Sequence, residues 1–219
     1  MRLIQMMKFT AWAALWQNSQ MRGMKSMCSS SPTAVPPSTE TQILAQKQEE
    51  ARRANALLGV KAVHFGALPD MRLDTVSHVE VNQLIEETVD TVAPEVVYTH
   101  FYGDVNLDHQ MVYRSTLVAV RPVPGQTVRE LYCYRVPSST EWSPQLGHTV
   151  FLPNTMVDIS DYTARKEAAL LAYQTEERPY PHPRSAQYVR ETDRTCGLQW
   201  GMGSARPSRV SKYRSSWVS

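Results

Sequence analysis

The stretch Glu95-Val96-Val97-Tyr98-Thr99-His100 decides the fold, because it is a mostly apolar run without polar alternation. Such a run is typical of a strand that is buried on both faces of a parallel sheet. Segments with helical spacing of apolar residues alternate with short strand-like segments on both sides of it. We expect helices over 41–58, 77–92, 112–119 and 161–172, and strands over 61–65, 128–136 and 156–159. This alternation predicts an α/β fold with a doubly wound parallel sheet.

Local signals mark the ends of three of these helices. Gly59 stands where a C-terminal cap belongs, and Ser77 with Glu80 has the spacing of a capping box. Asp161 is the expected cap of the last helix. In parallel sheets ligands bind beyond the carboxyl ends of the strands, so the loop after residue 100 is the predicted site of chemistry.

Composition divides the chain into three parts. Residues 1–40 carry four basic and one acidic side chain (+3), residues 41–192 carry 14 basic and 19 acidic (−5), and residues 193–219 carry five basic and one acidic (+4). The overall charge of +2 therefore hides an acidic domain between two basic ends. We expect 41–192 to be the folded domain, 1–40 to be a non-native-looking or disordered segment, and 193–219 to be a basic, disordered tail.

The chain offers few other signals of function. Three widely spaced cysteines fit a reduced, cytoplasmic protein, and no run of 18 apolar residues predicts a membrane span. Phosphate-binding, dinucleotide-binding and nucleophile-elbow motifs are absent from the sequence. Arg206, Arg209, Lys212 and Arg214 in the tail could bind nucleic acid, but no recognition motif accompanies them, so no nucleic-acid partner is expected.

The loop Gly103-Asp104-Val105-Asn106-Leu107-Asp108-His109 concentrates polar side chains between the strand and a helix. An imidazole beside a carboxylate can be a metal ligand or a general base. The alternative is structural: Asp108 would be the N-cap of the helix and His109 a residue of its first turn. Spacing alone leaves both readings open, because one histidine does not make a zinc site.

Residues 42–191 resemble the LmbE/PIG-L family of zinc-dependent N-deacetylases. The stretches that carry the resemblance are 49–60 (EEARRANALLGV), 68–70 (LPD), 98–109 (YTHFYGDVNLDH), 138–142 (SSTEW) and 173–176 (YQTE). The resemblance implies a Rossmann-like sheet flanked by helices, one zinc ion, and an N-acetylglucosamine-like sugar or conjugate as substrate.

The resemblance also implies roles for individual residues. His109 would be a zinc ligand, Asp108 and Asn106 would stand at the catalytic positions, and Asp70, Asp104 and Glu141 would bind substrate. The family often has an arginine three residues before Glu50, where this chain has Lys47. A soluble, cytoplasmic enzyme is expected, either as a monomer or as a homo-oligomer.

The His-Pro-Asp-Asp motif that supplies two zinc ligands and the general base in this family is missing from the sequence. Residues 2–9 (RLIQMMKF) can be encoded so that a shifted reading frame gives Pro-His-Pro-Asp-Asp-Glu-Val. We therefore hypothesise that residues 1–38 and 194–219 are read from a shifted frame, which leaves the first β-α-β unit replaced and the fold incomplete.

Three functions follow from these observations. The first is a zinc-dependent deacetylase by ancestry that is inactive as written, because two ligands and the base are missing. The second is a carbohydrate-binding or interaction protein that keeps the Asp70 and Glu141 side of a sugar pocket. The third, nucleic-acid binding through the tail, is the least favoured.

Overall fold

The fold is built on one central sheet. The computed structural model describes residues 3–7, 24–29, 37–66 and 68–210. Within this part the strands are β1 (Leu3–Met7), β2 (Met24–Ser29), β3 (Ala62–Gly66), β4 (Val96–His100), β5 (Glu130–Tyr134), β6 (Thr155–Asp158) and β7 (Ala205–Val210). The helices are α1 (Pro37–Leu57), α2 (His78–Val92), α3 (Leu107–Ala119), α4 (Thr163–Leu171) and α5 (Ala186–Leu198).

The strand order in the sheet is β3-β2-β1-β4-β5-β7-β6. The first five strands in this order pair in parallel with one another, and β7 runs antiparallel to both β5 and β6. The predicted α/β class with a Rossmann-like parallel sheet is confirmed. The antiparallel β7 was not expected, because the sequence of residues 205–210 contains little apolar material that would predict a strand.

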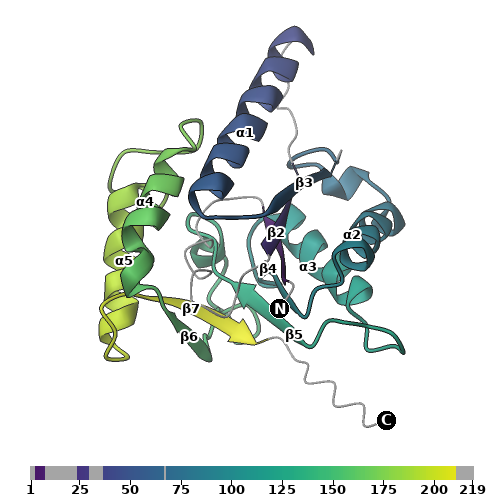
Figure 1. The fold of residues 1–219 in the computed structure, drawn as a ribbon. Coiled ribbons are helices and arrows are strands. Elements are labelled where there is room, and N and C mark those ends of the chain that lie inside the picture. Colours follow the sequence, from purple (N-terminus) through teal and green to yellow (C-terminus); the bar gives the residue numbers. More distant parts are fainter. Residues whose placement is uncertain (1–2, 8–23, 30–36, 67, 211–219) are drawn as a thin grey trace.

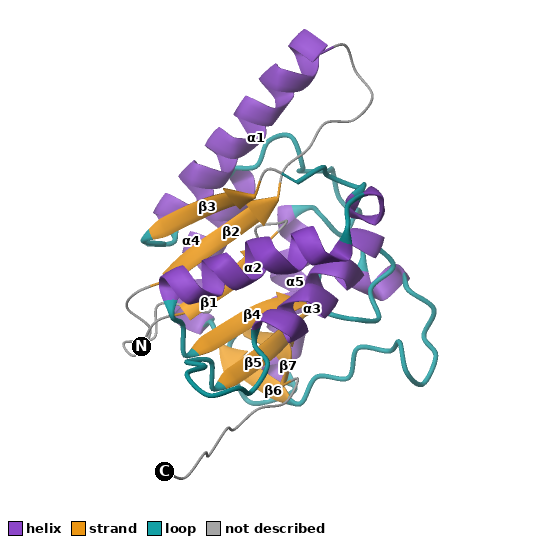
Figure 2. Ribbon diagram, turned by 90° about the vertical axis from the view of Figure 1, so that its right-hand side faces the viewer, coloured by secondary structure: helices purple, strands orange, loops and turns teal. Residues whose placement is uncertain are grey.

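Helices cover both faces of this sheet (Figure 1). The helices α2 and α3 lie on one side, and α1, α4 and α5 lie on the other. Figure 2 shows α2 and α3 crossing in front of the strands. Each face has its own apolar cluster, and β4 contributes to both: Val96 and Tyr98 pack with the α1 and α4 side, whereas Val97 packs with the α2 and α3 side. The alternation of side chains along β4 therefore joins the two cores.

The apolar stripe of α2 was predicted correctly, but its cap was not. Val81, Ile85, Val89 and Val92 are buried against β4 and β5. Ser77 is the N-cap residue, yet its side chain makes no capping hydrogen bond, so the expected capping box is wrong. Likewise Tyr162, not Asp161, precedes the first residue of α4.

The two ends of the chain differ from the expected segments. Residues 3–7 and 24–29 form β1 and β2 in the interior of the sheet, where β1 pairs with both β2 and β4. The remaining residues of the first 36 lie outside the described part.

The expected boundary at residue 193 falls inside α5, and β7 follows that helix. The reason is a buried ionic cluster: Asp193 of α5 contacts Lys166 of α4 and accepts a hydrogen bond of 3.0 Å from Arg206 of β7. Arg206 is only 1% exposed and also donates to the carbonyl of Arg135. Charged residues that composition assigns to a solvated tail are therefore interior partners.

A search of the described helices finds none that is both long and apolar enough to cross a membrane.

Candidate functional site

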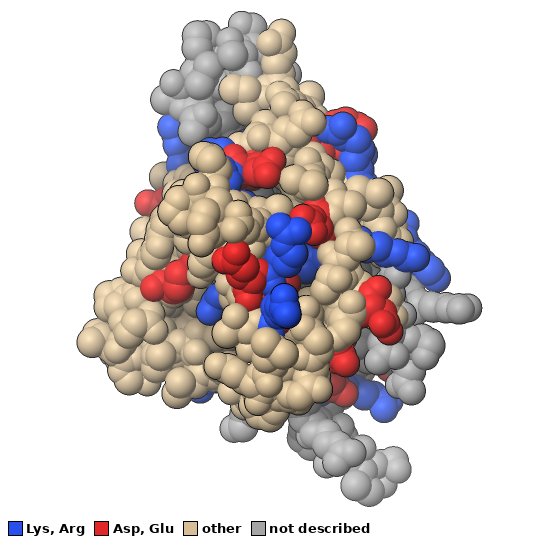
Figure 3. Space-filling model, turned by 90° about the vertical axis from the view of Figure 1, so that its left-hand side faces the viewer, with Lys and Arg blue, Asp and Glu red and all other residues tan. Residues whose placement is uncertain are grey.

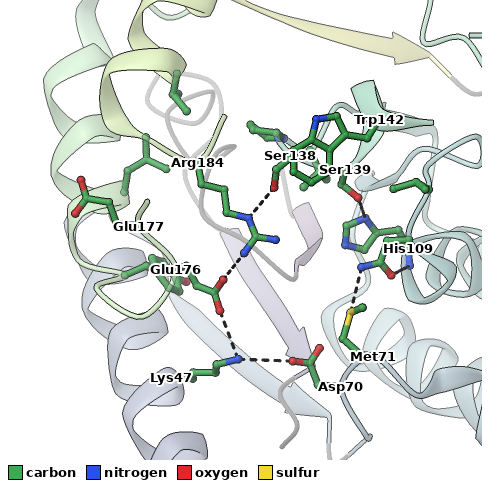
Figure 4. A pocket seen from close by; sticks show the side chains of 17 residues that line it. Lys47, Asp70, Met71, His109, Ser138, Ser139, Trp142, Glu176, Glu177 and Arg184 are labelled. Carbon is green, nitrogen blue, oxygen red and sulfur yellow. Dashed lines mark hydrogen bonds and ion pairs between the residues drawn. The ribbon is translucent and has the colours of Figure 1, made fainter. Parts of the chain in front are cut away.

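The candidate site is a cavity of about 430 Å³ beyond the carboxyl ends of β4 and β5. Chain connections leave β1 and β4 in opposite directions, which is the arrangement that places ligand sites in parallel sheets. Segments from several parts of the sequence line the cavity: Lys47 of α1, the loop after β3, the loop after β4, the segment 136–142 after β5, and residues between 170 and 189. Figure 4 shows charged side chains on one wall and His109 on the other.

His109 is held from beneath by Asp104. The Nδ1 atom of His109 lies 3.2 Å from Oδ1 of Asp104, and both side chains are buried. Asp104 also accepts hydrogen bonds from the hydroxyls of Ser139 and Thr140 and from the backbone N–H of Asn106. Because Nδ1 is engaged and His109 lines the cavity, Nε2 is the ring nitrogen left to face a ligand.

The charge of Asp104 is stabilised by these partners. Burial alone would raise the pKa of its carboxyl, but the hydrogen bond and the charge of His109, followed by the hydroxyls of Ser139 and Thr140, lower the pKa below its ordinary value. Asp104 is therefore a fixed carboxylate that orients the imidazole. It does not line the cavity, in contrast to the expectation that it contacts substrate.

A second imidazole supports the ring of His109 from its face. His100, the last residue of β4, stacks on His109 with ring centroids 4.2 Å apart and planes inclined by 19°. The Nε2 atom of His100 lies 3.3 Å from the hydroxyl of Tyr134. His100 is thus a packing partner in the sheet and is not among the residues that line the cavity.

Ser139, His109 and Asp104 do not form a nucleophilic triad. The Oγ atom of Ser139 lies 3.3 Å from Nδ1 of His109, the same nitrogen that Asp104 approaches. Ser139 also donates its hydroxyl hydrogen directly to Asp104. In a catalytic triad the serine hydroxyl and the orienting carboxylate contact different nitrogens of the imidazole. Ser139 is therefore a positioning residue here.

Asn106 and Asp108 shape the loop after β4. Asn106 is the N-cap of α3, where its side-chain oxygen accepts from the backbone N–H groups of Asp108 and His109. Asp108 is therefore not the N-cap that one interpretation of the sequence made it, and its side chain accepts a hydrogen bond of 3.1 Å from the backbone N–H of Leu73. Asn106 lines the cavity, whereas the buried Asp108 joins the loops after β3 and β4.

The wall opposite His109 is a chain of alternating charges (Figure 4). The Nζ atom of Lys47 lies 3.8 Å from Asp70 and 3.4 Å from Glu176. Glu176 in turn accepts from Arg184 at 2.6 Å, and the Nε of Arg184 donates to the hydroxyl of Ser138 at 2.7 Å. Asp70 therefore reaches the cavity as expected, and Lys47 takes part in its polar wall.

A buried carboxylate holds this wall in place. Glu50 of α1 is fully buried, and its oxygens accept from the side chain of Gln46 and from both the backbone N–H and the hydroxyl of Thr175. Thr175 immediately precedes Glu176. Glu50 thus fixes the segment that carries Glu176 onto the helix that carries Lys47.

Trp142, in the segment after β5, borders the cavity. Its side chain is 57% exposed and lines the cavity, so it does not cover the sheet. The ring of His182 approaches it edge-on at 5.8 Å. Glu141 does not line the cavity; it accepts a hydrogen bond of 2.6 Å from the backbone N–H of Ser138 and so supports the loop.

Some site residues gave no signal in the sequence. Only the family resemblance marks Ser138 and Ser139, and Arg184, which also lines the cavity, lies in a Pro-rich segment without a motif. Met71 and Val105 also line it and were not predicted. Exposed apolar residues in loops carry no periodicity from which they could be recognised.

The residues present do not fit a zinc site with three protein ligands. Among the described residues, no group of three His, Cys, Asp or Glu side chains is placed to hold a metal ion. Residues 1–41 of the sequence contain neither His nor Asp, and only Cys28 and Glu40 are of ligand type there. His109 is therefore the one member of the expected ligand set that this chain offers.

Comparisons with known proteins agree with the fold and the loop after β4. The family model described as "PIG-L: GlcNAc-PI de-N-acetylase" matches residues 19–120. The N,N'-diacetylchitobiose deacetylase from Pyrococcus horikoshii is 15% identical, with 95% of this chain and 82% of that chain covered and a TM-score of 0.66.

Two further solved structures are similar over nearly their whole length. The zinc-inhibited form of teicoplanin deacetylase Orf2 is 14% identical, with 97% and 99% covered and a TM-score of 0.71. The 4-carboxy-2-hydroxymuconate hydratase GalB from Pseudomonas putida KT2440 is 16% identical, with both chains fully covered and a TM-score of 0.70. At these identities the likeness shows the fold, which hosts more than one reaction.

Proposed function

Because the PIG-L family model matches residues 19–120, we propose that the cavity of this chain binds an N-acetylated sugar or sugar conjugate. The family description and two of the similar structures name deacetylases of such compounds. The cavity supports the proposal with a polar wall of Asp70, Lys47 and Glu176 that can exchange hydrogen bonds with sugar hydroxyls.

The observation that carries the proposal is the fixed orientation of His109 opposite this wall. With Nδ1 directed at Asp104, Nε2 faces the cavity and can contact the acetamido group of a bound sugar. A bound zinc ion would supply Lewis-acid activation of the amide carbonyl and of water in this family. A single ligand, His109, does not form such a zinc site. We therefore propose that this chain binds the sugar without hydrolysing it.

Binding and turnover test the two parts of this proposal separately. Titration calorimetry with methyl N-acetyl-β-glucosaminide should give saturable binding, and Lys47→Met should weaken it about tenfold, because Asp70 and Glu176 lose their shared cation. The exposed Lys61→Met is the matched control. Binding that is unchanged in Lys47→Met would remove the polar wall from the proposal.

A deacetylation assay with added zinc tests the absence of turnover. We expect no release of acetate from N-acetylglucosamine conjugates. Zinc-dependent turnover that His109→Ala abolishes would show that the chain completes its metal site by other residues, and would contradict the inactive state proposed here.

A shifted reading frame would account for the missing motif. The family match begins at residue 19, so it does not include residues 2–9, from which the shifted codons give His-Pro-Asp-Asp. Sequencing the coding DNA across codons 1–45 and 190–219 tests this hypothesis. Codons that are incompatible with CAT CCA GAT GAT would reject it, whereas compatible codons predict that the corrected frame restores zinc-dependent deacetylation.

A further inference from the structure

The side chain of His182 holds the backbone of Arg184. Its Nδ1 atom accepts a hydrogen bond of 3.0 Å from the backbone N–H of Arg184, two residues further along the chain. A backbone N–H can only donate, so Nδ1 carries no proton in this arrangement and the proton of the neutral ring is on Nε2. The contact therefore requires the uncharged form of the imidazole.

Arg184 links two walls of the cavity (Figure 4). Its Nε donates to the hydroxyl of Ser138 at 2.7 Å, and one of its terminal nitrogens donates to Glu176 at 2.6 Å. Ser138 lies after β5, whereas Glu176 and Arg184 lie between α4 and α5. The position of this link depends on the loop backbone that His182 fixes.

The ring of His182 also contacts the segment after β5. It approaches the ring of Trp142 edge-on, with centroids 5.8 Å apart, and Trp142 lines the cavity. Ser138, in the same segment, has a φ of 62°, a conformation that its surroundings have to maintain. Two contacts thus join residues 182–184 to residues 138–142: the hydrogen bond from Arg184 and the ring contact of His182.

A proton on Nδ1 of His182 is incompatible with this arrangement. It would turn the acceptor into a second donor that faces the N–H of Arg184, and it would place a positive ring two residues from a guanidinium. Histidine side chains commonly gain a proton between pH 8 and pH 5. The loop that carries Arg184 therefore loses its hydrogen bond to the ring in acid.

We propose that His182 is a positioning residue for ligand binding, which holds Arg184 against Ser138 only while its Nδ1 is unprotonated. Acid releases Arg184 from Ser138 and weakens the binding of a ligand in the cavity. The statement on affinity rests on the proposed function, whereas the release of Arg184 does not depend on which ligand binds.

Other titratable and charged groups share this corner of the molecule. They are Glu176 and Glu177 on the same segment, Glu141 after β5, Lys47 of α1, and His109 on the opposite wall. All of them are unchanged in variants of His182. A comparison of such variants over one range of pH therefore isolates the contribution of this ring.

The release of Arg184 can be measured in the full chain without ligand. Protein labelled with ¹⁵N-arginine shows the backbone and Nε signals of Arg184 in NMR spectra, and Arg184→Lys identifies them by their absence. Both signals should shift as the pH falls from 7.5 to 5.0. They should stay in place in His182→Asn, because the Oδ1 atom of asparagine accepts from the same N–H and does not titrate. The matched control is His148→Asn, an exposed histidine outside the cavity lining, which should behave as the unchanged protein does.

Calorimetric titration with methyl N-acetyl-β-glucosaminide measures the effect on binding. The affinity of the unchanged protein should fall about tenfold between pH 7.5 and pH 5.0, the scale of one lost hydrogen bond. His182→Asn should change by less than about twofold over this range. His182→Ala should bind about tenfold more weakly than the unchanged protein at pH 7.5, and His182→Asn should recover that loss.

The two measurements separate this proposal from the proposed function. Signals of Arg184 that ignore pH, or that shift equally in His182→Asn, would overturn the role of His182. A pH-dependent affinity that persists in His182→Asn would assign the effect to the other titratable groups and overturn it as well. Signals that respond through His182 while the sugar does not bind at pH 7.5 would instead reject the proposed function and retain the link between His182 and Arg184.

Discussion

Asp104 and His109 form a buried pair in which Oδ1 of Asp104 lies 3.2 Å from Nδ1 of His109. The pair fixes which nitrogen of the imidazole faces the cavity, and Ser139 and Thr140 complete the hydrogen bonds of the carboxylate. The hydrogen bonds from Ser139 and Thr140, in the segment after β5, to Asp104, in the loop after β4, thereby help to set the geometry of the site.

Asp104→Asn should destabilise the protein and change its response to acid. The variant removes the charge to which His109, Ser139 and Thr140 are arranged, at a cost of about 2–3 kcal/mol at pH 7. Since the folded pKa of Asp104 lies below its unfolded value, its carboxylate contributes stability above the ordinary aspartate pKa, and this contribution is lost as the pH falls through the folded pKa. Urea unfolding between pH 7 and pH 3 should therefore show a shallower acid loss in Asp104→Asn. Parallel curves for the two proteins, with the exposed Asp90→Asn as control, would contradict this assignment.

Asn106→Ala should cost about 1 kcal/mol of unfolding free energy, because α3 loses the side chain that accepts from the N–H groups of Asp108 and His109. Asn106→Ser should recover most of that loss, since serine is also a favourable N-cap residue. Chemical denaturation measures both variants. A serine variant no more stable than the alanine variant would mean that the amide acts through its contact with Met71 and not as a cap.

Glu50→Ala should destabilise the protein by about 2–4 kcal/mol, because the backbone N–H and hydroxyl of Thr175 lose a buried acceptor. It should also weaken sugar binding, since Thr175 precedes Glu176 in the polar wall. The exposed Glu49→Ala on the same helix is the control. If calorimetry finds an unchanged affinity for the sugar in a folded Glu50→Ala variant, Glu50 does not position Glu176 for sugar binding.

Lys166 should make the protein more stable as the pH rises from 7 to 10. Burial, and next the charge of Arg206, lower the pKa of Lys166 to about 7, although Asp193 opposes the shift. Between that value and the unfolded pKa of 10.5, the unfolded chain holds a proton that the folded chain lacks, so stability increases with pH across this window. Lys166→Met should remove the slope, which urea midpoints at pH 7, 8.5 and 10 would reveal. If the slope is retained in Lys166→Met but lost in the exposed Lys61→Met, the pH dependence of stability comes from Lys61 and not from Lys166.

The sequence predicts the parallel core well and the ends poorly. Val96 to His100 are all buried, as the unbroken apolar run indicates, and Gly59 has the positive φ of 74° that suits a C-terminal cap. These features depend on local pattern. The strand β7 depends instead on Asp193, whose carboxylate pairs with Arg206 and also contacts Lys166 only after α4 and α5 have packed. No window of sequence contains that information.

The same distinction applies to the site. His109 and Asp70 could be named from the family motifs, and the structure brings both to the cavity. Asp104, Asp108 and Glu141 also carry carboxylates, but these accept hydrogen bonds from protein groups. The carboxylate of Asp108 accepts from the backbone N–H of Leu73, and that of Glu141 accepts from the backbone N–H of Ser138. Arg184 joins the cavity from a segment 75 residues beyond His109. Which polar groups face the ligand is decided by tertiary packing.

Of the four cations at the basic end that could bind nucleic acid, Arg206 is buried in the structure and Arg209 is half-buried. Arg206 is buried with Asp193, and Arg209 lies 6.0 Å from the ring centroids of both Phe101 and Tyr102. Lys212 and Arg214 lie outside the described residues. On the face that carries α4 and α5, acidic and basic side chains are interspersed (Figure 3), as in the pair Arg190–Glu167.

The position of β7 between β5 and β6 also defines the smallest piece of this chain that could be handled as a stable unit. A protein shortened to residue 192 would expose the hydrogen-bonding edge of β5 at Tyr132 and Tyr134, and would leave Lys166 without its counter-ion. An uncovered, apolar strand edge is a template for association between molecules. Shortened versions should therefore aggregate, and a fusion partner is better attached beyond residue 210 than in place of the final strand.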